Sequence, residues 1–126
     1  MRAQLSFEFF IALSFLILLF LVSLAIYEEE RKSADALLSR MSAQSVAFDF
    51  SRAINGVHQC GDGCAYKLQL GEGYSLTVYG RMVEVLRDSQ LGQAPLVTDS
   101  VELHSATPGS YILVVNNNGV VELHDV

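Results

Sequence analysis

The first half of this chain lacks the residues that interrupt helices. Glycine and proline are absent before Gly56, and the whole chain has only two prolines. Clustered cations are lacking too: 8 Lys and Arg stand against 14 Asp and Glu, and Arg31-Lys32 is the only basic pair. Because phosphate binding needs clustered Lys and Arg, this balance argues against nucleic acid as a partner.

Known catalytic patterns are also missing. There is no HExxH, P-loop or dinucleotide-binding glycine pattern. The run 73–77 departs from the G-x-S-x-G elbow at its last position. His58, His104 and His124 have no supporting constellation and are interpreted as surface histidines. We therefore expect no catalytic residues, no cofactor and no metal site, and no enzymatic activity.

What the chain has in excess is apolar sequence near its start. Mean hydropathy is +0.33 over 126 residues, and most of the excess lies before Tyr27. Residues 9–27 form a run of 19 without a charge, and a helix of that length spans about 30 Å, the thickness of a bilayer core. The run is apolar on all sides, which indicates lipid or other helices around it. Residues 4–27 are therefore predicted to be a transmembrane or filament-core helix.

One acid, Glu8, lies at the front of this apolar helix. A charge in hydrocarbon costs roughly 2.5–3.5 kcal/mol on insertion scales, so it calls for a function. A cleavable secretory signal would use Ser23-Leu24-Ala25 as its cleavage site, but the apolar run exceeds the usual length. A plain single-span anchor explains the hydrophobicity but leaves Glu8 unexplained. A third interpretation accounts for both features.

The segment Gln4-Leu5-Ser6-Phe7-Glu8 fits the pattern Q-x-S-x-E directly before a membrane-length apolar run. In this it resembles the class III signal peptide of archaeal type IV pilin-like proteins. The resemblance implies that residues 1–3 are a leader and that a prepilin peptidase cuts between Ala3 and Gln4. Gln4, Ser6 and Glu8 are then the motif residues, and Glu8 becomes the fifth residue of the mature chain.

The same resemblance implies a structural role in a surface filament. The precursor would lie in the membrane with its N-terminus in the cytoplasm, and the mature protein would be at the cell surface. Partners would be further copies or related pilins, the prepilin peptidase, the pilus assembly ATPase and its membrane platform protein. Glu8 would pair with the new amino group of its own or a neighbouring subunit, fixing register in the packed helices. The alternative is a single-span, membrane-anchored extracellular binding or adhesion module that does not polymerise.

Residues 28–55 are predicted to continue the helix as an amphipathic segment, because apolar residues recur there at helical spacing. This apolar stripe is expected to pack against a sheet. The helix is expected to end at Asn55-Gly56, since glycine is the usual residue just beyond a helix C-terminus. The stripe comprises Leu37, Leu38, Met41, Ser45, Phe48 and Ala53.

Residues 56–126 are predicted to form a small antiparallel β head, because the hydrophobic period changes to alternation. Asn118-Gly119 is a strong hairpin signal, and residues 89–93 are interpreted as a loop. About six strands are expected, over 66–70, 74–79, 82–86, part of 95–103, 111–115 and 120–124. The predicted fold class is α+β, a pilin-like lollipop with a long N-terminal helix and a small, mainly antiparallel head.

Two cysteines, Cys60 and Cys64, lie between the predicted helix and the first strand. In a segment expected to be extracellular, a close pair favours a disulfide around a tight loop. Two free thiols are one alternative. A metal site that adds His58 is another, although CxxxC alone is not a zinc pattern.

Overall fold

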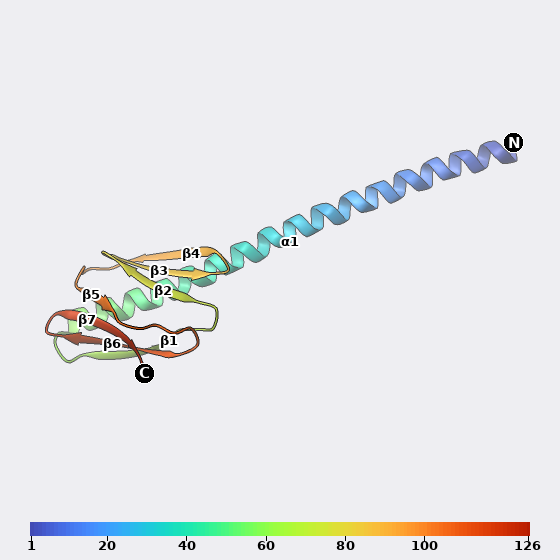
Figure 1. The fold of residues 1–126 in the computed structure, drawn as a ribbon. Coiled ribbons are helices and arrows are strands. Elements are labelled where there is room, and N and C mark those ends of the chain that lie inside the picture. Colours follow the sequence, from blue (N-terminus) through green and yellow to red (C-terminus); the bar gives the residue numbers. More distant parts are fainter. The chain divides into compact units, whose positions relative to one another are not determined.

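The structure, a computed structural model, describes all residues 1–126 and consists of one long helix followed by seven strands (Figure 1). The α+β fold class, a long N-terminal helix followed by a mainly antiparallel β region, is confirmed. The elements are α1 (Arg2–Cys60), β1 (Ala65–Gln69), β2 (Ser75–Tyr79), β3 (Met82–Arg87), β4 (Gln90–Pro95), β5 (Val101–Leu103), β6 (Tyr111–Asn117) and β7 (Val120–Asp125).

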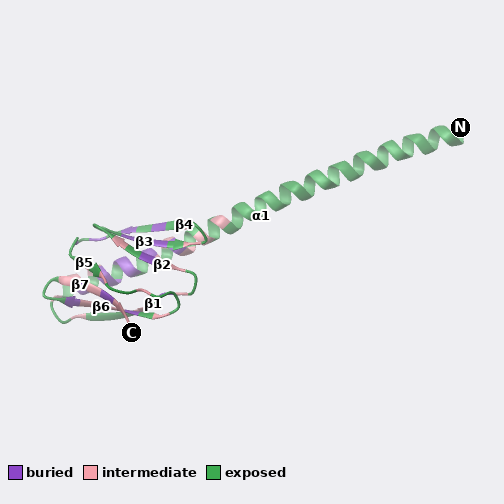
Figure 2. Cartoon of the chain, in the orientation of Figure 1, coloured by how far each residue is buried: buried purple, intermediate pink, exposed green.

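The chain divides into two compact units, Met1–Asp35 and Ala36–Val126. The first unit is helical from Arg2 onward, and every residue in it is exposed (Figure 2). The second unit contains the rest of α1 and all seven strands, and it holds the hydrophobic core. We call this second unit the head.

The strands of the head form two sheets. A three-stranded meander has the order β2-β3-β4 and is antiparallel throughout. A four-stranded sheet has the order β1-β6-β7-β5, in which β1, β6 and β7 pair antiparallel. The pairing of β5 with β7 is parallel, which the hairpin pattern of the sequence did not predict.

Helix α1 ends at Cys60, beyond the predicted end at Asn55-Gly56. Gly56 lies within the helix, and the residue just beyond the helix end is Gly61, whose φ of 105° is favourable only for glycine. The extra turn matters for packing because Val57, which it contributes, is buried in the core.

The boundaries of the middle strands also differ from the prediction, and there are seven strands rather than six. Most of the predicted loop 89–93 belongs to β4, and the predicted strand within 95–103 is reduced to β5. The turn between β3 and β4 is made by Asp88 and Ser89, both with positive φ and neither glycine, so the usual hairpin signal was missing. The hairpin predicted at Asn118-Gly119 is confirmed between β6 and β7.

The core is formed by one face of the head's part of α1 together with the inward residues of both sheets (Figure 2). On the helix, the buried apolar residues Ala43, Ala47, Phe50, Ile54 and Val57 follow a 4-3-4-3 spacing, which is one face of a helix. Buried and less buried residues alternate along β6 and β7, as expected where one face of a sheet is covered.

The predicted packing face of the helix is wrong. Leu37, Met41 and Phe48 are 58%, 61% and 45% exposed, and Leu38 is exposed as well. Of the predicted stripe only Ala53 is buried. Met41 precedes the buried Ala43 by two residues, and this places them about 200° apart around the helix. The sheets therefore cover the face with the smaller residues and leave the larger ones outside.

Polar side chains of the helix bind the outer strand of the meander. The Gln44 amide donates to the backbone carbonyl of Gln93 and accepts from its N–H at 3.1 Å. The Ser51 hydroxyl donates to the carbonyl at the end of β4, and the Val97 N–H donates to Asn55 Oδ1 at 2.9 Å. These bonds satisfy backbone groups that an edge strand otherwise leaves open to another chain.

Candidate functional site

The predicted processing motif lies in the first unit, near the start of α1. Ala3, Gln4, Ser6 and Glu8 are helical and exposed in this chain. Gln4 and Glu8 are four residues apart, so they lie one above the other, with side chains about 5–6 Å apart at Cβ. A positive charge created at Gln4 would therefore lie within reach of the Glu8 carboxylate.

Glu8 has no partner within its own chain. The two salt bridges of the structure join Arg87 to Asp88 and His104 to Glu102, and no side-chain hydrogen bond reaches Glu8. An unpaired carboxylate is stable in water but costly in an apolar surrounding. Any assembly that buries this part of the helix therefore has to neutralise Glu8, either by protonation or with a cation.

The helix behind Glu8 is long and apolar enough to cross a membrane. Both serines in this run are already satisfied: Ser14 donates to the Phe10 carbonyl at 2.7 Å, and Ser23 donates to the Leu19 carbonyl at 2.9 Å. Such bonds to the preceding turn let a serine enter an apolar environment without an open donor. The run is thus suited to lipid or to other helices over its whole circumference.

A second apolar surface lies in the head, on the helix face away from the sheets. Leu37, Met41 and Phe48 form this surface, which we call the outer stripe. Together with neighbouring polar residues they line a shallow groove of about 670 Å³. Arg40, Asp49 and Arg52 also line it, so the groove combines apolar contact area with a small excess of positive charge.

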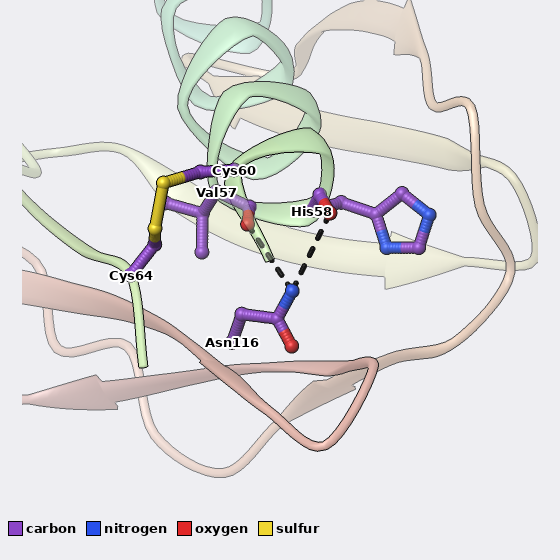
Figure 3. The surroundings of a disulfide bond; sticks show 5 residues. All are labelled: Val57, His58, Cys60, Cys64 and Asn116. Atoms are coloured by element: carbon purple, nitrogen blue, oxygen red, sulfur yellow. Dashed lines mark hydrogen bonds between the residues drawn. A yellow bond between two sulfur atoms is a disulfide. The ribbon is translucent and has the colours of Figure 1, made fainter. Parts of the chain in front are cut away.

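At the other end of the head, the end of α1 is held by a disulfide and by a buried side chain (Figure 3). Cys60 and Cys64 are joined, as predicted. The Asn116 amide nitrogen donates to the carbonyls of Val57 at 3.2 Å and His58 at 3.4 Å. These are carbonyls of the last helical turn, which have no partner within the helix.

The disulfide removes both alternatives from the sequence analysis. The two sulfurs are bonded to each other, so Cys60 and Cys64 are not free thiols and have no thiolate to offer a metal together with His58. On the chain-entropy relation, closing so short a loop contributes only about 2 kcal/mol. We interpret the disulfide as a structural cross-link between the end of the helix and the start of β1.

Two features of the head were not found from the sequence. Asn116 was not singled out, although its side chain binds the end of the helix. His104 and His124 were read as isolated surface residues, whereas their rings stack with centroids 5.8 Å apart. Their proximity depends on the parallel pairing of β5 with β7, which has no local sequence signal.

Comparison with known proteins gives no relative for this chain. No family model, no curated protein and no solved structure matches it. A functional proposal therefore depends on the motif, the apolar helix and the surfaces described above.

Proposed function

We propose that this chain is a structural, pilin-like subunit of an archaeal type IV pilus-like surface filament. A prepilin peptidase removes residues 1–3, and the subunit polymerises through its N-terminal helix. The assembly ATPase and the membrane platform protein extract it from the membrane, and neighbouring copies or related pilins surround it in the filament. The subunit catalyses no reaction in this proposal.

The observation that carries the proposal is the placement of Glu8. It is the one charged residue between Gln4 and Tyr27, it has no partner in its own chain, and it lies one turn after Gln4. Cleavage before Gln4 creates an α-amino group at that distance. In a packed bundle this cation can bind Glu8 of the same or a neighbouring subunit. The bond penalises sliding, because a shifted helix would leave both charges buried and unpaired.

The exposed apolar surfaces support assembly as well. The whole circumference of the first helical unit is exposed in the isolated chain. The outer stripe of Leu37, Met41 and Phe48 adds a further apolar face in the head. A subunit that polymerises along its helix would cover these surfaces, and hydrophobic burial of about 25 cal/mol per Å² would hold the filament together.

Mass spectrometry of the mature N-terminus tests the processing step. The protein should be isolated from the membrane and from sheared surface material of an archaeal host with a prepilin peptidase. We expect a chain that begins at Gln4. A chain that keeps Met1, or one that begins after Ala25, would contradict the proposal.

A substitution series at Glu8 tests assembly. Glu8→Ala should leave the protein in the membrane and abolish filaments, and Glu8→Gln should also impair them because the amide carries no charge. Glu28→Ala, which removes an exposed acid beyond the apolar run, is the matched control and should assemble normally. Normal filaments from Glu8→Ala, or a wild-type protein that stays single in the membrane, would favour the non-polymerising anchored module instead.

A further inference from the structure

The parallel strand pair β5–β7 brings four chemically active side chains to one face of the four-stranded sheet. Glu102 is the register partner of Glu122. Two residues further along, His104 lies beside His124, and the His104 N–H donates to the Leu123 carbonyl at 2.9 Å. Alternate residues of a strand face the same side. The intervening residues belong to the core, so the two glutamates and two histidines lie on the outer face.

The side chains of this group are close enough to share one ion. One ligand atom each from His104, Glu122 and His124 lies within 4.8 Å of the others. Ligands of a tetrahedral zinc ion, at 2.0–2.2 Å from the metal, are roughly 3.5 Å apart. His104 is exposed and the other two are half-buried, so small side-chain rotations can close the difference.

The charge of the group also favours a cation. Glu102 and Glu122 are adjacent across the two strands, where like charges repel. No Lys or Arg forms a salt bridge with either of them; Glu102 lies 3.6 Å from His104 Nε2, and Glu122 accepts a hydrogen bond from Asn117 at 3.3 Å. A divalent ion bound at this place would offset the charge of these two carboxylates.

We propose that His104, Glu122 and His124 bind a divalent transition-metal ion of the zinc class. Two imidazoles and one carboxylate form a ligand set that suits such an ion, with water at the remaining position. Glu102, beside His104 Nε2, acts as a positioning residue that orients the imidazole and leaves its other nitrogen for the metal.

The ion would stabilise the edge of the four-stranded sheet at β5. Strand β5 has only three residues and pairs on one side only, with β7. A metal held by His104 just after β5 and by two residues of β7 joins the two strands directly. The head should therefore resist unfolding better with the metal than without it, since a ligand that binds only the folded state stabilises it by mass action.

Titration of the full-length protein in detergent micelles tests the site. The sample carries no histidine tag, is first stripped with a chelator, and is then titrated with Zn²⁺ in a calorimeter and with Co²⁺ by visible absorption. We expect one ion per chain. His104→Gln, His124→Gln and Glu122→Gln should each weaken binding roughly tenfold or more.

Two control variants show whether the loss is specific. His58→Gln removes the remaining histidine, which lies in the helix, and Glu72→Gln removes an acid between β1 and β2. Both should bind the metal like the unaltered protein, with circular dichroism confirming that every variant is folded. The proposal would be overturned if the unaltered protein bound no metal up to about 1 mM Zn²⁺. It would also be overturned if His104→Gln and His124→Gln bound the metal as tightly as the unaltered protein.

Thermal unfolding gives a second readout. Zn²⁺ should raise the midpoint of the unaltered protein and of His58→Gln, and it should leave the midpoint of the His104→Gln, His124→Gln double variant unchanged. An equal rise in the double variant would show that the metal acts elsewhere on the chain.

Discussion

Gly92 of β4 lies directly against the helix backbone at Ala43. A Cβ atom added at residue 92 would overlap the backbone of Ala43 and Gln44, which belong to a rigid helix and cannot move aside as a side chain could. Ala43 itself is fully buried, and Gln44 binds the backbone of the next strand residue. The close approach of strand and helix therefore requires glycine at this position.

Gly92→Ala should destabilise the head by roughly 1–3 kcal/mol or more, the cost of overpacking a well-packed core. Denaturant unfolding of the full-length protein in micelles, followed by the circular dichroism of the β strands, measures the change. Gly56→Ala is the matched control, because Gly56 is helical and has open space around its Cβ position. It should raise stability by about 0.5–1 kcal/mol. Equal effects of the two substitutions on stability would contradict the requirement for glycine at residue 92.

Asn116, in β6 of the four-stranded sheet, binds the end of the helix. It is buried, donates to the Val57 and His58 carbonyls, and accepts a hydrogen bond from the Gly119 N–H at 2.9 Å. Asn116→Ala leaves these groups without a partner, so we expect a loss of about 1–3 kcal/mol in unfolding free energy. Asn117→Ala, at the exposed neighbouring position, should change stability by less than about 0.5 kcal/mol. A small effect at Asn116 would mean that water replaces its amide.

The long helix could be predicted from the absence of glycine and proline, but its packing face could not. Two faces of the segment carry apolar residues at helical spacing: Met41 and Phe48 on one, Ala43 and Ala47 on the other. Size favours the first face as the core. The structure uses the second, because Gly92 allows a strand to approach only where the helix residues are small.

The β region shows a similar division between local and distant information. Asn118-Gly119 specifies its own turn, so that hairpin was predicted correctly. Asp88-Ser89 makes a comparable turn without glycine and was read as part of a loop. The grouping of His104 with His124 depends on parallel pairing between segments 20 residues apart, which only the tertiary structure specifies.

Asp125 should make the head sensitive to acid. The Thr107 hydroxyl and N–H, and then the Ser110 hydroxyl, donate hydrogen bonds that lower the pKa of its carboxyl. A lowered pKa in the folded state means that the stabilisation is complete above the ordinary carboxyl range and is lost as pH falls through the folded value. The midpoint temperature of unfolding should therefore decrease as the pH falls below about 4.

Asp125→Asn separates this effect from general acid denaturation. The variant should be less stable than the unaltered protein at pH 7, and the difference should shrink toward pH 2, where the native carboxyl is protonated too. Asp99→Asn, at an exposed position, serves as the control and should keep the acid dependence of the unaltered protein. If the difference in stability between Asp125→Asn and the unaltered protein stayed constant with pH, the proposed role of the carboxylate charge would be contradicted.

The outer stripe should matter more for assembly than for folding. Met41 and Phe48 are 61% and 45% exposed in the isolated chain, so Met41→Ser with Phe48→Ser leaves no closed cavity and should lower the unfolding midpoint only modestly. In a filament that covers these residues, each substitution loses about 1–2 kcal/mol of burial energy, because only about half of each side chain is still exposed in the isolated chain, and filament yield should fall. Leu91→Ser, at a half-exposed position of β4, controls for surface polarity and should assemble normally. Normal filaments from the double variant, counted by electron microscopy, would exclude the stripe from the subunit interface.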